Sequence, residues 1–560
     1  MTSTTPYQIR LNLSGSGPAP PIRNAEADRV TLRLIQTKAR AGEMGLAISL
    51  SEAALASGLE HPMVLNLVAV GLENQDRVEE AQDLLRRALD LAPGDLGVLN
   101  ALGIGALRLE RFTDALGYFE ACLASHPNFA AGHANHGAAL LGLSRLLEAE
   151  LSLRRSLELQ PGHLAALSGL AAIASRRGDH AKARTLGETV LDTEPNHPDS
   201  TISVATAELA LGAPDAAEQR LHRLLADSRP TQVDRATAMG LLADVLDARG
   251  QTVEAFGAYS QSNDMLRVHY AARYGVGEGA IDATLRMAGY FETALPFPGP
   301  APARRGDGPA LVFLMGFPRS GTTLLETILG GHEQVETLEE RETLIDSTRN
   351  FLVDNAGLDR LLAADEGQLA PFRGAYWARA REAGARLDRR VFIDKAPLNT
   401  LKLPLIARLF PDARILFSRR DPRDVVLSCF RRRFQINPQM YPLLTLDGAA
   451  GFYDAAMRLN ALLEPTLPNP RRIVRHEQLV TDFEGEVGQT LDFLGLAWRP
   501  QMTDVAGRAR TGAIATPSGA QISRGLNAEG IGQWRRYRDQ MAPVLPILAP
   551  WVERFGYAPA

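Results

Sequence analysis

The chain has 560 residues, of which 45% are hydrophobic and 22% charged, and its net charge is −5 at pH 7. Such a chain can bury more than one hydrophobic core, and no nucleic-acid-binding motif accompanies its basic residues, so no nucleic-acid partner is expected. Its two cysteines exclude a disulfide framework, and no apolar run approaches the roughly 18 residues that a transmembrane helix needs.

The amino-terminal tail, which we place at residues 1–27, is rich in Ser, Thr, Pro and Gly and lacks an apolar centre. This composition is not that of an ordinary signal peptide, and it predicts a disordered segment. With only Cys122 and Cys429 in the chain, we expect a cytoplasmic protein. The preference for Arg over Lys and the abundance of Ala, Leu and Gly indicate a bacterial source.

A 34-residue period runs through the first half of the chain. Alanines recur at this interval, at Ala47, Ala81, Ala115, Ala149, Ala183 and Ala217. A small residue precedes five of them by twelve positions, and a proline closes four of the units. This pattern resembles the tetratricopeptide repeat, in which two antiparallel helices pack through small residues. The resemblance implies an all-α solenoid over residues 28–270, whose concave face binds a protein partner or acceptor.

Residues 271–309 are expected to form a connecting helix and a Pro-rich linker. Five prolines, at positions 296, 298, 300, 302 and 309, fall in its second half. Closely spaced prolines favour extended, semi-rigid chain. We therefore predict a two-domain protein, with an α/β domain over residues 310–560.

The most informative segment is Leu311–Leu329, where an apolar strand runs into Gly316 and Pro318 and then into a helical pattern. A tight strand-to-helix turn presents backbone N–H groups and the positive end of a helix dipole at one point, which favours a phosphate. No Lys follows Gly321, so the loop is not a Walker A motif, and a kinase or ATPase is disfavoured. A capped helix without a ligand is the alternative. The candidate contacts are Arg319, Ser320, Gly321, Thr322 and Thr323.

Lysine is rare in this chain, which has 60 basic residues but only four Lys. Lys395 ends an apolar run from Val391, at the carboxyl end of a predicted strand, where open α/β sheets bind their ligands. Unlike a guanidinium, an ammonium can release a proton beside a bridging oxygen. A solvated surface Lys is the alternative, and it is the one we expect for Lys402.

A third predicted strand ends at Arg419 and Arg420, and a helix follows the turn at Asp421-Pro422. Ser428 lies one to two helical turns further on. An Arg can bind a phosphate through two charge-assisted hydrogen bonds. A surface Arg cluster that pairs with the neighbouring aspartates is the alternative, and it is favoured for Arg419 and for Arg423 taken singly. We expect residues 431–433 to be a solvated helix face.

Together these segments resemble sulfotransferases that use 3′-phosphoadenosine 5′-phosphosulfate (PAPS), over roughly residues 310–540. Residues 318–323 are similar to the 5′-phosphosulfate loop of that family, and its Arg and Ser that hold the 3′-phosphate correspond to Arg420 and Ser428. The resemblance implies an α/β fold with a parallel sheet and a P-loop-like phosphosulfate-binding loop. It also implies PAPS as the co-substrate and no metal.

The protein-tyrosine sulfotransferase branch is the one that this chain resembles. Glu339 and Glu340 follow the loop at the spacing of that branch's Glu pair, whereas Pro397 stands where aryl and steroid sulfotransferases carry a His. The resemblance implies that Glu340 is the general base, that Lys395 is the cation or acid at the leaving oxygen, and that Arg319 holds the donor. A solvated, charged helix start is the alternative for Glu340.

Residues 515–524 resemble the segment that closes over the nucleotide in this branch, so Ser518 and Arg524 are further candidate phosphate contacts. A mobile surface loop is the alternative. The chain also departs from the branch. His476 stands where a Tyr is frequent, and Cys122 and Cys429 fall in separate predicted domains, so no disulfide is available near the site.

Two classes of function are consistent with the sequence. The first is a PAPS-dependent sulfotransferase whose repeats recruit a protein acceptor or partner, with protein tyrosine implied as the acceptor only by resemblance. The second is a tetratricopeptide-repeat scaffold with a catalytically degenerate nucleotide-binding domain. The sequence leaves open whether the acceptor is a protein tyrosine, a saccharide, a lipid or a small phenol.

Overall fold

The computed structural model describes residues 25–294, 309–511 and 526–559. The chain divides into two compact units, residues 1–166 and 167–560. Most of the predicted tail, the proline-rich part of the predicted linker, and the candidates Ser518 and Arg524 lie outside the described residues.

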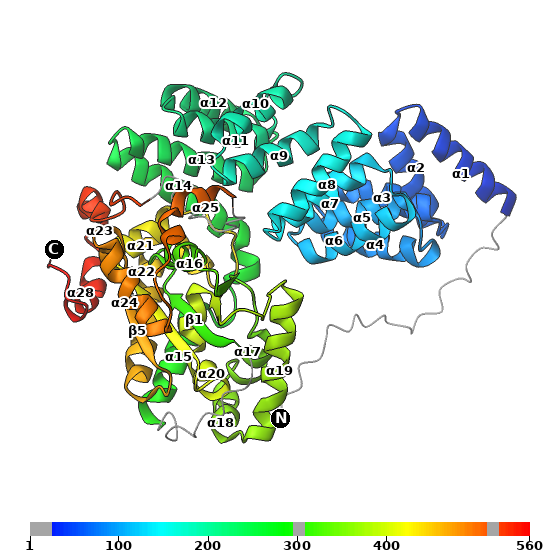
Figure 1. Cartoon of the computed structure of the whole chain (residues 1–560). Coiled ribbons are helices and arrows are strands. Elements are labelled where there is room, and N and C mark those ends of the chain that lie inside the picture. The colour runs from blue at the N-terminus through cyan, green and yellow to red at the C-terminus, as the bar shows by residue number, and fades with distance from the viewer. Residues whose placement is uncertain (1–24, 295–308, 512–525, 560) are drawn as a thin grey trace. The chain divides into compact units, whose positions relative to one another are not determined.

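The first unit consists of helices that pack in consecutive pairs (Figure 1). These helices are α1 (Ala25–Arg40), α2 (Met44–Ala56), α3 (Pro62–Asn74), α4 (Val78–Leu91), α5 (Leu96–Arg108), α6 (Phe112–Ser125), α7 (Ala130–Gly142) and α8 (Leu146–Leu159). A Cβ at Gly103 would lie 2.4 Å from the ring of Phe119, so a small residue is required where the helices of a pair approach closely.

The 34-residue period of the sequence is also a period of the backbone. The turn between two helices contains a residue with positive φ at Gly42, Asp76, Glu110, Ser144, Gly178 and Gly212. The six alanines that mark the period are fully buried. Because the same left-handed turn and the same buried position recur with the sequence period, each repeat forms one helix–turn–helix unit.

The boundary between the two units falls within α9 (Leu164–Arg176), and further helices of the repeat type follow. They are α10 (His180–Leu191), α11 (Pro198–Ala210), α12 (Pro214–Ala226), α13 (Gln232–Ala248) and α14 (Thr252–Tyr274). The next helix, α15 (Ala280–Thr293), packs against α22 (Leu446–Leu463) of the α/β domain. Across the described residues, no helix is both long enough and apolar enough to cross a bilayer.

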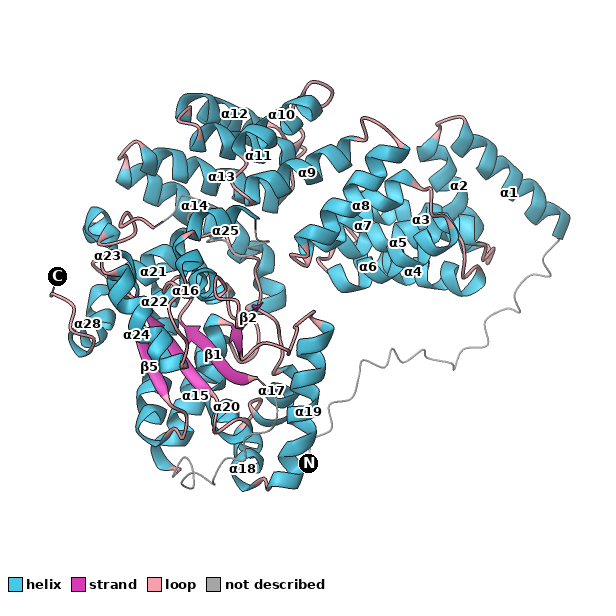
Figure 2. Cartoon of the chain, in the orientation of Figure 1, coloured by secondary structure: helices cyan, strands magenta, loops and turns pink. Residues whose placement is uncertain are grey.

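A five-stranded parallel sheet forms the centre of the carboxyl-terminal part, with the strand order β2-β3-β1-β4-β5 (Figure 2). The strands are β1 (Ala310–Gly316), β2 (Val335–Glu339), β3 (Val391–Lys395), β4 (Arg414–Arg419) and β5 (Arg471–Arg475). The helical repeats followed by an α/β domain with a parallel sheet confirm the predicted fold class.

Helices and short 3₁₀ segments (η) connect and cover the strands. They are α16 (Thr322–Leu329), α17 (Ile345–Phe351), α18 (Asn355–Ala363), α19 (Glu366–Glu382), η1 (Pro397–Lys402), α20 (Leu403–Leu409), α21 (Pro422–Arg431), η2 (Tyr441–Leu444), α22, η3 (Glu464–Thr466), α23 (His476–Thr481), α24 (Phe483–Leu494), η4 (Pro500–Thr503), α25 (Val505–Thr511), η5 (Gln533–Tyr537), α27 (Arg538–Met541) and α28 (Leu545–Arg554).

Each face of the sheet contributes to a separate hydrophobic core. Val312 and Leu314 of β1 pack into one core with α16 and α24, while Phe313 and Met315 pack into the other with α19 and α22. Burial on both faces explains why these strands read as continuous apolar runs rather than as alternating patterns. Since all five strands are parallel, the loops after β1, β2, β3 and β4 meet at one edge of the sheet.

Candidate active site

The loop between β1 and α16 makes a tight turn with two left-handed residues. Arg319 has a φ of 71° and Gly321 a φ of 103°. A Cβ at Gly321 would lie 2.8 Å from Nδ1 of His476, so this position requires glycine for both its backbone conformation and its space. Positive φ at Arg319, which is not glycine, is the kind of backbone strain that clusters at functional sites.

The hydroxyl residues of the loop face inward. Ser320, Thr322 and Thr323 are all buried. Among the described residues, neither the Ser320 hydroxyl nor Nδ1 of His476 has a hydrogen-bond partner. Buried polar atoms normally find partners, so this loop has unused hydrogen-bonding capacity at the amino terminus of a helix.

Arg319, Arg420 and Ser428 lie together beside the loop. Nε of Arg319 donates to the Ser428 hydroxyl at 3.0 Å, and Nη1 of Arg420 donates to the carbonyl of Arg319 at 3.1 Å. Nε of Arg420 is buried and has no hydrogen-bond partner in the part of the chain that the structure describes. Burial and the neighbouring cations Arg432 and Arg420 lower the pKa of Arg319 to about 9. This crowding of positive charge favours an anionic ligand.

His476 is buried against the same group. Burial, followed by the positive charges of Arg420 and Arg319, lowers its pKa to about 3. The ring is therefore neutral at pH 7, and it offers a neutral imidazole where the resembled branch frequently has a tyrosine ring.

Lys395 is fully buried among three carboxylates. Its Nζ lies 2.7 Å from Oε1 of Glu340, 3.2 Å from Oε2 of Glu326 and 3.5 Å from Oε1 of Glu339. Burial lowers the pKa of the ammonium, but the combined attraction of these carboxylates outweighs it, and the pKa is raised above its usual value. The alternative of a solvated surface lysine is therefore wrong for Lys395. Strand pairing contributes to this arrangement, since Glu339 and Lys395 are register partners in β2 and β3.

Glu340 is the most exposed of the three carboxylates, with 42% of its side chain accessible, against 21% for Glu339 and 8% for Glu326. Its backbone N–H donates to the Lys395 carbonyl at 2.7 Å, and its φ of 43° is left-handed. The carboxylate can therefore contact the buried ammonium and an external molecule at the same time.

A buried aspartate next to Lys395 fixes the surrounding loop. Asp394 accepts hydrogen bonds from the Thr343 hydroxyl at 2.7 Å and from the Tyr376 hydroxyl at 3.0 Å. Burial raises its pKa to about 6 even though both hydrogen bonds act in the opposite direction. These contacts hold the segment after Glu340 against the end of β3.

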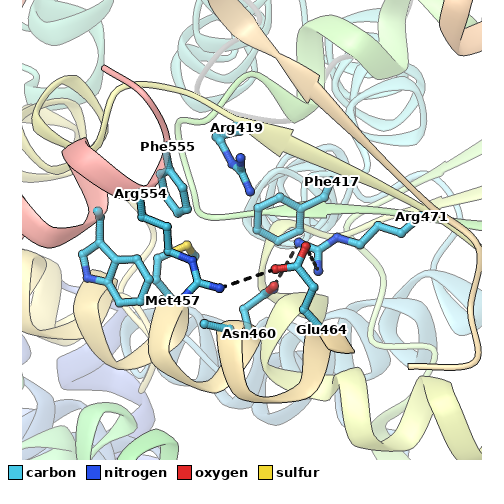
Figure 3. A pocket seen from close by; sticks show the side chains of 10 residues that line it. Phe417, Arg419, Met457, Asn460, Glu464, Arg471, Arg554 and Phe555 are labelled. Carbon is cyan, nitrogen blue, oxygen red and sulfur yellow. Dashed lines mark hydrogen bonds and ion pairs between the residues drawn. The ribbon is translucent and has the colours of Figure 1, made fainter. Parts of the chain in front are cut away.

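Three other basic residues, which lie at or beyond the carboxyl ends of β3 and β4, contact groups outside the cluster of Arg319, Arg420 and Ser428. Arg423 pairs with Asp421 at 2.7 Å, and Lys402 pairs with Glu342 at 2.9 Å. Arg419 lies over the ring of Phe555 at 4.1 Å and lines a small pocket (Figure 3). The predicted pairing with an aspartate is thus correct for Arg423, but this residue is buried rather than at the surface. The same alternative is wrong for Arg419, because the guanidinium lies over an aromatic ring.

Comparison with known proteins identifies the two parts of the chain. The Sulfotransferase family matches residues 309–500. Those residues form a sulfotransferase-family domain. Tetratricopeptide-repeat families match residues 100–163, 135–199 and 174–240. The repeats therefore precede the sulfotransferase domain, as the sequence predicted.

Several curated proteins are similar to parts of this chain. An uncharacterized protein of Aquifex aeolicus (strain VF5) is 24% identical over 73% of this chain, which spans about half, 53%, of that protein. A putative protein-tyrosine sulfotransferase of Caenorhabditis briggsae is 26% identical over 42% of this chain and 88% of its own length. Protein-tyrosine sulfotransferase 2 of Gallus gallus is 26% identical over 44% of this chain and 70% of its own length. The chain is thus distantly similar to protein-tyrosine sulfotransferases.

Among solved structures, a tetratricopeptide repeat protein from Parabacteroides merdae matches with a TM-score of 0.34 and 16% identity, over 43% of this chain and 93% of its own length.

One charged residue of the sulfotransferase domain was missed by sequence reasoning. Glu326 is a buried carboxylate on α16, within an otherwise apolar stretch that contains Leu324, Leu325 and Ile328. Burial raises its pKa above the usual range, although Lys395 acts against this rise. The sequence feature that could have identified Glu326 is a single acidic residue within an otherwise apolar helical stretch.

Proposed function

We propose that the chain is a PAPS-dependent sulfotransferase that moves a sulfuryl group to an acceptor hydroxyl. The observation that carries the proposal is the convergence of the Arg319 loop, the buried Lys395 ammonium and the half-exposed Glu340 carboxylate at one edge of the sheet. Membership of the sulfotransferase family supports PAPS as the donor.

The donor would bind along the loop and α21. Ser320, Gly321, Thr322 and Thr323 would receive the phosphosulfate, and Arg420 and Ser428 the 3′-phosphate. The unpartnered Ser320 hydroxyl and Arg420 Nε support this assignment, because phosphate oxygens would satisfy both. The proposal requires no metal ion, since cationic side chains and backbone N–H groups supply the positive charge.

The transfer is an in-line displacement at sulfur. The bond from sulfur to the bridging phosphate oxygen breaks as a new bond forms to the acceptor oxygen, and the electron pair stays on the phosphate oxygen. Glu340 accepts the proton of the acceptor hydroxyl, and the Lys395 ammonium stabilises the negative charge on the leaving oxygen. Arg319 holds the donor during the transfer. The half-exposed position of Glu340 supports its role toward an external acceptor.

The acceptor carries the hydroxyl that receives the sulfuryl group. Protein tyrosine is the first candidate because distant relatives are named protein-tyrosine sulfotransferases. The repeats would recruit the protein acceptor or a partner that presents it.

We also propose the domain limits 28–270 for the repeats, 271–309 for the linker and 310–560 for the sulfotransferase domain. We further propose a bacterial source and a cytoplasmic location, and the two free thiols support the location.

The test uses full-length protein and sulfur-labelled PAPS. Cell extract is incubated with both, and label is sought separately in protein, glycan and lipid, with Lys395→Ala as the inactive control. Label that appears only with the wild type supports the proposal and identifies the acceptor class. Calorimetry with adenosine 3′,5′-bisphosphate in EDTA follows. Nucleotide binding without label transfer would favour the scaffold with a catalytically degenerate domain, and failure to bind the nucleotide would contradict the proposed donor site.

A further inference from the structure

The carboxyl-terminal end of α13, a helix of the repeats, contacts the sulfotransferase domain through the carboxylate of Asp247. Asp247 accepts a hydrogen bond from the Tyr537 hydroxyl at 2.6 Å, and it forms ion pairs with Arg536 at 3.0 Å and with Arg431. Nη2 of Arg536 also donates to the Asp247 backbone carbonyl at 2.9 Å. We call Asp247, Arg431, Arg536 and Tyr537 the Asp247 junction. It is mostly buried, since only 12% of the Asp247 side chain and 17% of the Arg431 side chain are accessible.

Neighbouring contacts make the junction part of a packed interface. Nδ2 of Asn263 on α14 donates to the Phe430 carbonyl at 2.8 Å, and the Phe430 and Phe256 rings lie 5.1 Å apart. Arg433 pairs with Asp244 of α13 at 2.8 Å. The expectation that residues 431–433 form a solvated helix face is therefore wrong, because α13 and α14 cover the end of α21.

The two segments that Asp247 joins both contact the candidate donor site. Arg431 lies on α21 one helical turn beyond Ser428, which accepts the hydrogen bond of Arg319. Tyr537 ends η5, in the segment whose Gly530 carbonyl accepts a hydrogen bond from Arg420. Asp247 thus contacts both segments from the side of the repeats.

The same two segments are also joined to each other. Asp424, near the start of α21, accepts hydrogen bonds from the backbone N–H groups of Gly532 at 2.7 Å and Trp534 at 2.9 Å. Asp424 therefore fixes η5 to the first turn of α21, and Asp247 fixes it to the last turn. Two attachments at opposite ends of a helix determine its direction, whereas one would allow it to pivot.

We propose that Asp247 is a positioning residue for the donor site, so that the last helical pair of the repeats, α13 and α14, belongs to the catalytic unit. The inference rests on the proposed function, because it assigns α21 and the segment before η5 to donor binding. Asp247 acts through Arg431 and Tyr537 and does not contact the donor itself.

The physical reason is the balance of charge. Without Asp247, the mostly buried guanidinium of Arg431 would lose the carboxylate that neutralises it, and uncompensated charge is costly in such a position. Arg431 would move toward solvent, and the last turn of α21 would move with it. Ser428 and Arg420 would then no longer hold the geometry that one bound phosphate requires.

The experiment compares full-length Asp247→Asn with the wild type. We expect the Kd for adenosine 3′,5′-bisphosphate, measured by calorimetry, to rise about tenfold, the scale typical of a residue that acts through another. The KM for the donor should rise with it, while the KM for a small phenol acceptor stays unchanged. Asp215→Asn is the matched control, because Asp215 forms an exposed ion pair with Arg249 in the neighbouring repeat. Its Kd should equal that of the wild type.

A second variant keeps the inference testable if Asp247→Asn does not fold. Tyr537→Phe removes only the hydroxyl that donates to Asp247, and it should raise the same Kd severalfold. A Kd within twofold of the wild type in every folded variant of the junction would overturn the inference while leaving the proposed function intact. Absence of nucleotide binding by the wild type would overturn both.

Discussion

Oε2 of Glu326 lies 3.2 Å from Nζ of Lys395, so the helix α16 that follows the Arg319 loop places a buried carboxyl group directly beside the candidate catalytic lysine. Lys395 is thereby held from two sides, by Glu326 on α16 and by the Glu339–Glu340 pair at the end of β2. A permanently charged ammonium suits the stabilisation of a leaving oxygen. Burial raises the pKa of Glu326 to about 8, so its ionised carboxylate supports that charge mainly above this pH, while Glu340 would contact the acceptor.

We therefore expect Glu326→Gln to lower kcat by about tenfold with little change in the Kd for adenosine 3′,5′-bisphosphate. The isosteric amide keeps the packing of α16 but removes the carboxyl group beside Lys395. Burial raises the pKa of that carboxyl to about 8, so the effect on kcat should be largest above that pH. Glu342→Gln is the matched control, since Glu342 pairs with Lys402 at the surface and exposed pairs contribute about 0–1 kcal/mol. An unchanged kcat in Glu326→Gln would show that the two other carboxylates suffice.

Glu340→Gln should separate binding from chemistry. The variant keeps the shape of the side chain but cannot accept a proton, so turnover should fall by a factor on the order of 10² or more. Nucleotide affinity should persist because the 319–323 loop is untouched. Steady-state kinetics and calorimetry check the two parts. If Glu340→Gln retains turnover near the wild-type rate, Glu339 is the next candidate for the base.

Gly321→Ala should damage the loop itself. The added Cβ would lie 2.8 Å from His476 Nδ1, and alanine is strained at a φ of 103°. We expect a loss of roughly 1–3 kcal/mol in the free energy of unfolding, together with weaker nucleotide binding. Chemical denaturation of the variant and of Gly374→Ala, at a helical position with open space around it, provides the comparison. Equal stability of the two variants would contradict the geometry of the loop.

His476 should make the stability of the protein depend on pH. Burial and the charges of Arg420 and Arg319 lower its pKa to about 3, below the ordinary value of 6.5. Between these values the unfolded chain binds a proton that the folded chain does not, so stability is lost as the pH falls from about 6.5 toward 3. The loss is up to about 1.4 kcal/mol per pH unit. His476→Asn should show a flatter profile over this window, and an unchanged slope would contradict the burial of a neutral imidazole.

Removal of residues 1–166, the first compact unit, should leave donor binding intact, because the Asp247 junction lies entirely within residues 167–560. If the early repeats recruit a protein acceptor, the KM for that acceptor should rise while kcat on a small phenol stays the same. A shorter chain that begins at residue 296 loses α13 and α14, and we expect it to bind nucleotide poorly. Nucleotide binding is measured for both truncated chains side by side. Equal affinity of the two chains would contradict the expected contribution of α13 and α14.

The sequence alone determined those features that depend on local chemistry and on periodicity. The 34-residue spacing predicted the helical repeats because each unit places small residues at the same positions, where its two helices pack closely. The run from Leu311 to Leu329 predicted a strand, a tight turn and a helix, since apolar residues, glycine and capping residues encode these locally. The roles of Glu340, Arg420 and Ser428 remain predictions that came from resemblance to a family.

Only the tertiary structure determined the contacts that cross long stretches of chain. Glu326 meets Lys395 because β3 pairs with β1 and β2 in the sheet order, which no local pattern encodes. Asp247 meets Arg431 although 184 residues separate them, so residues 431–433 could not be distinguished in advance from an ordinary charged helix face. A charged side chain has the same local signature in water and in a buried ion pair, and only the fold determines which environment it occupies.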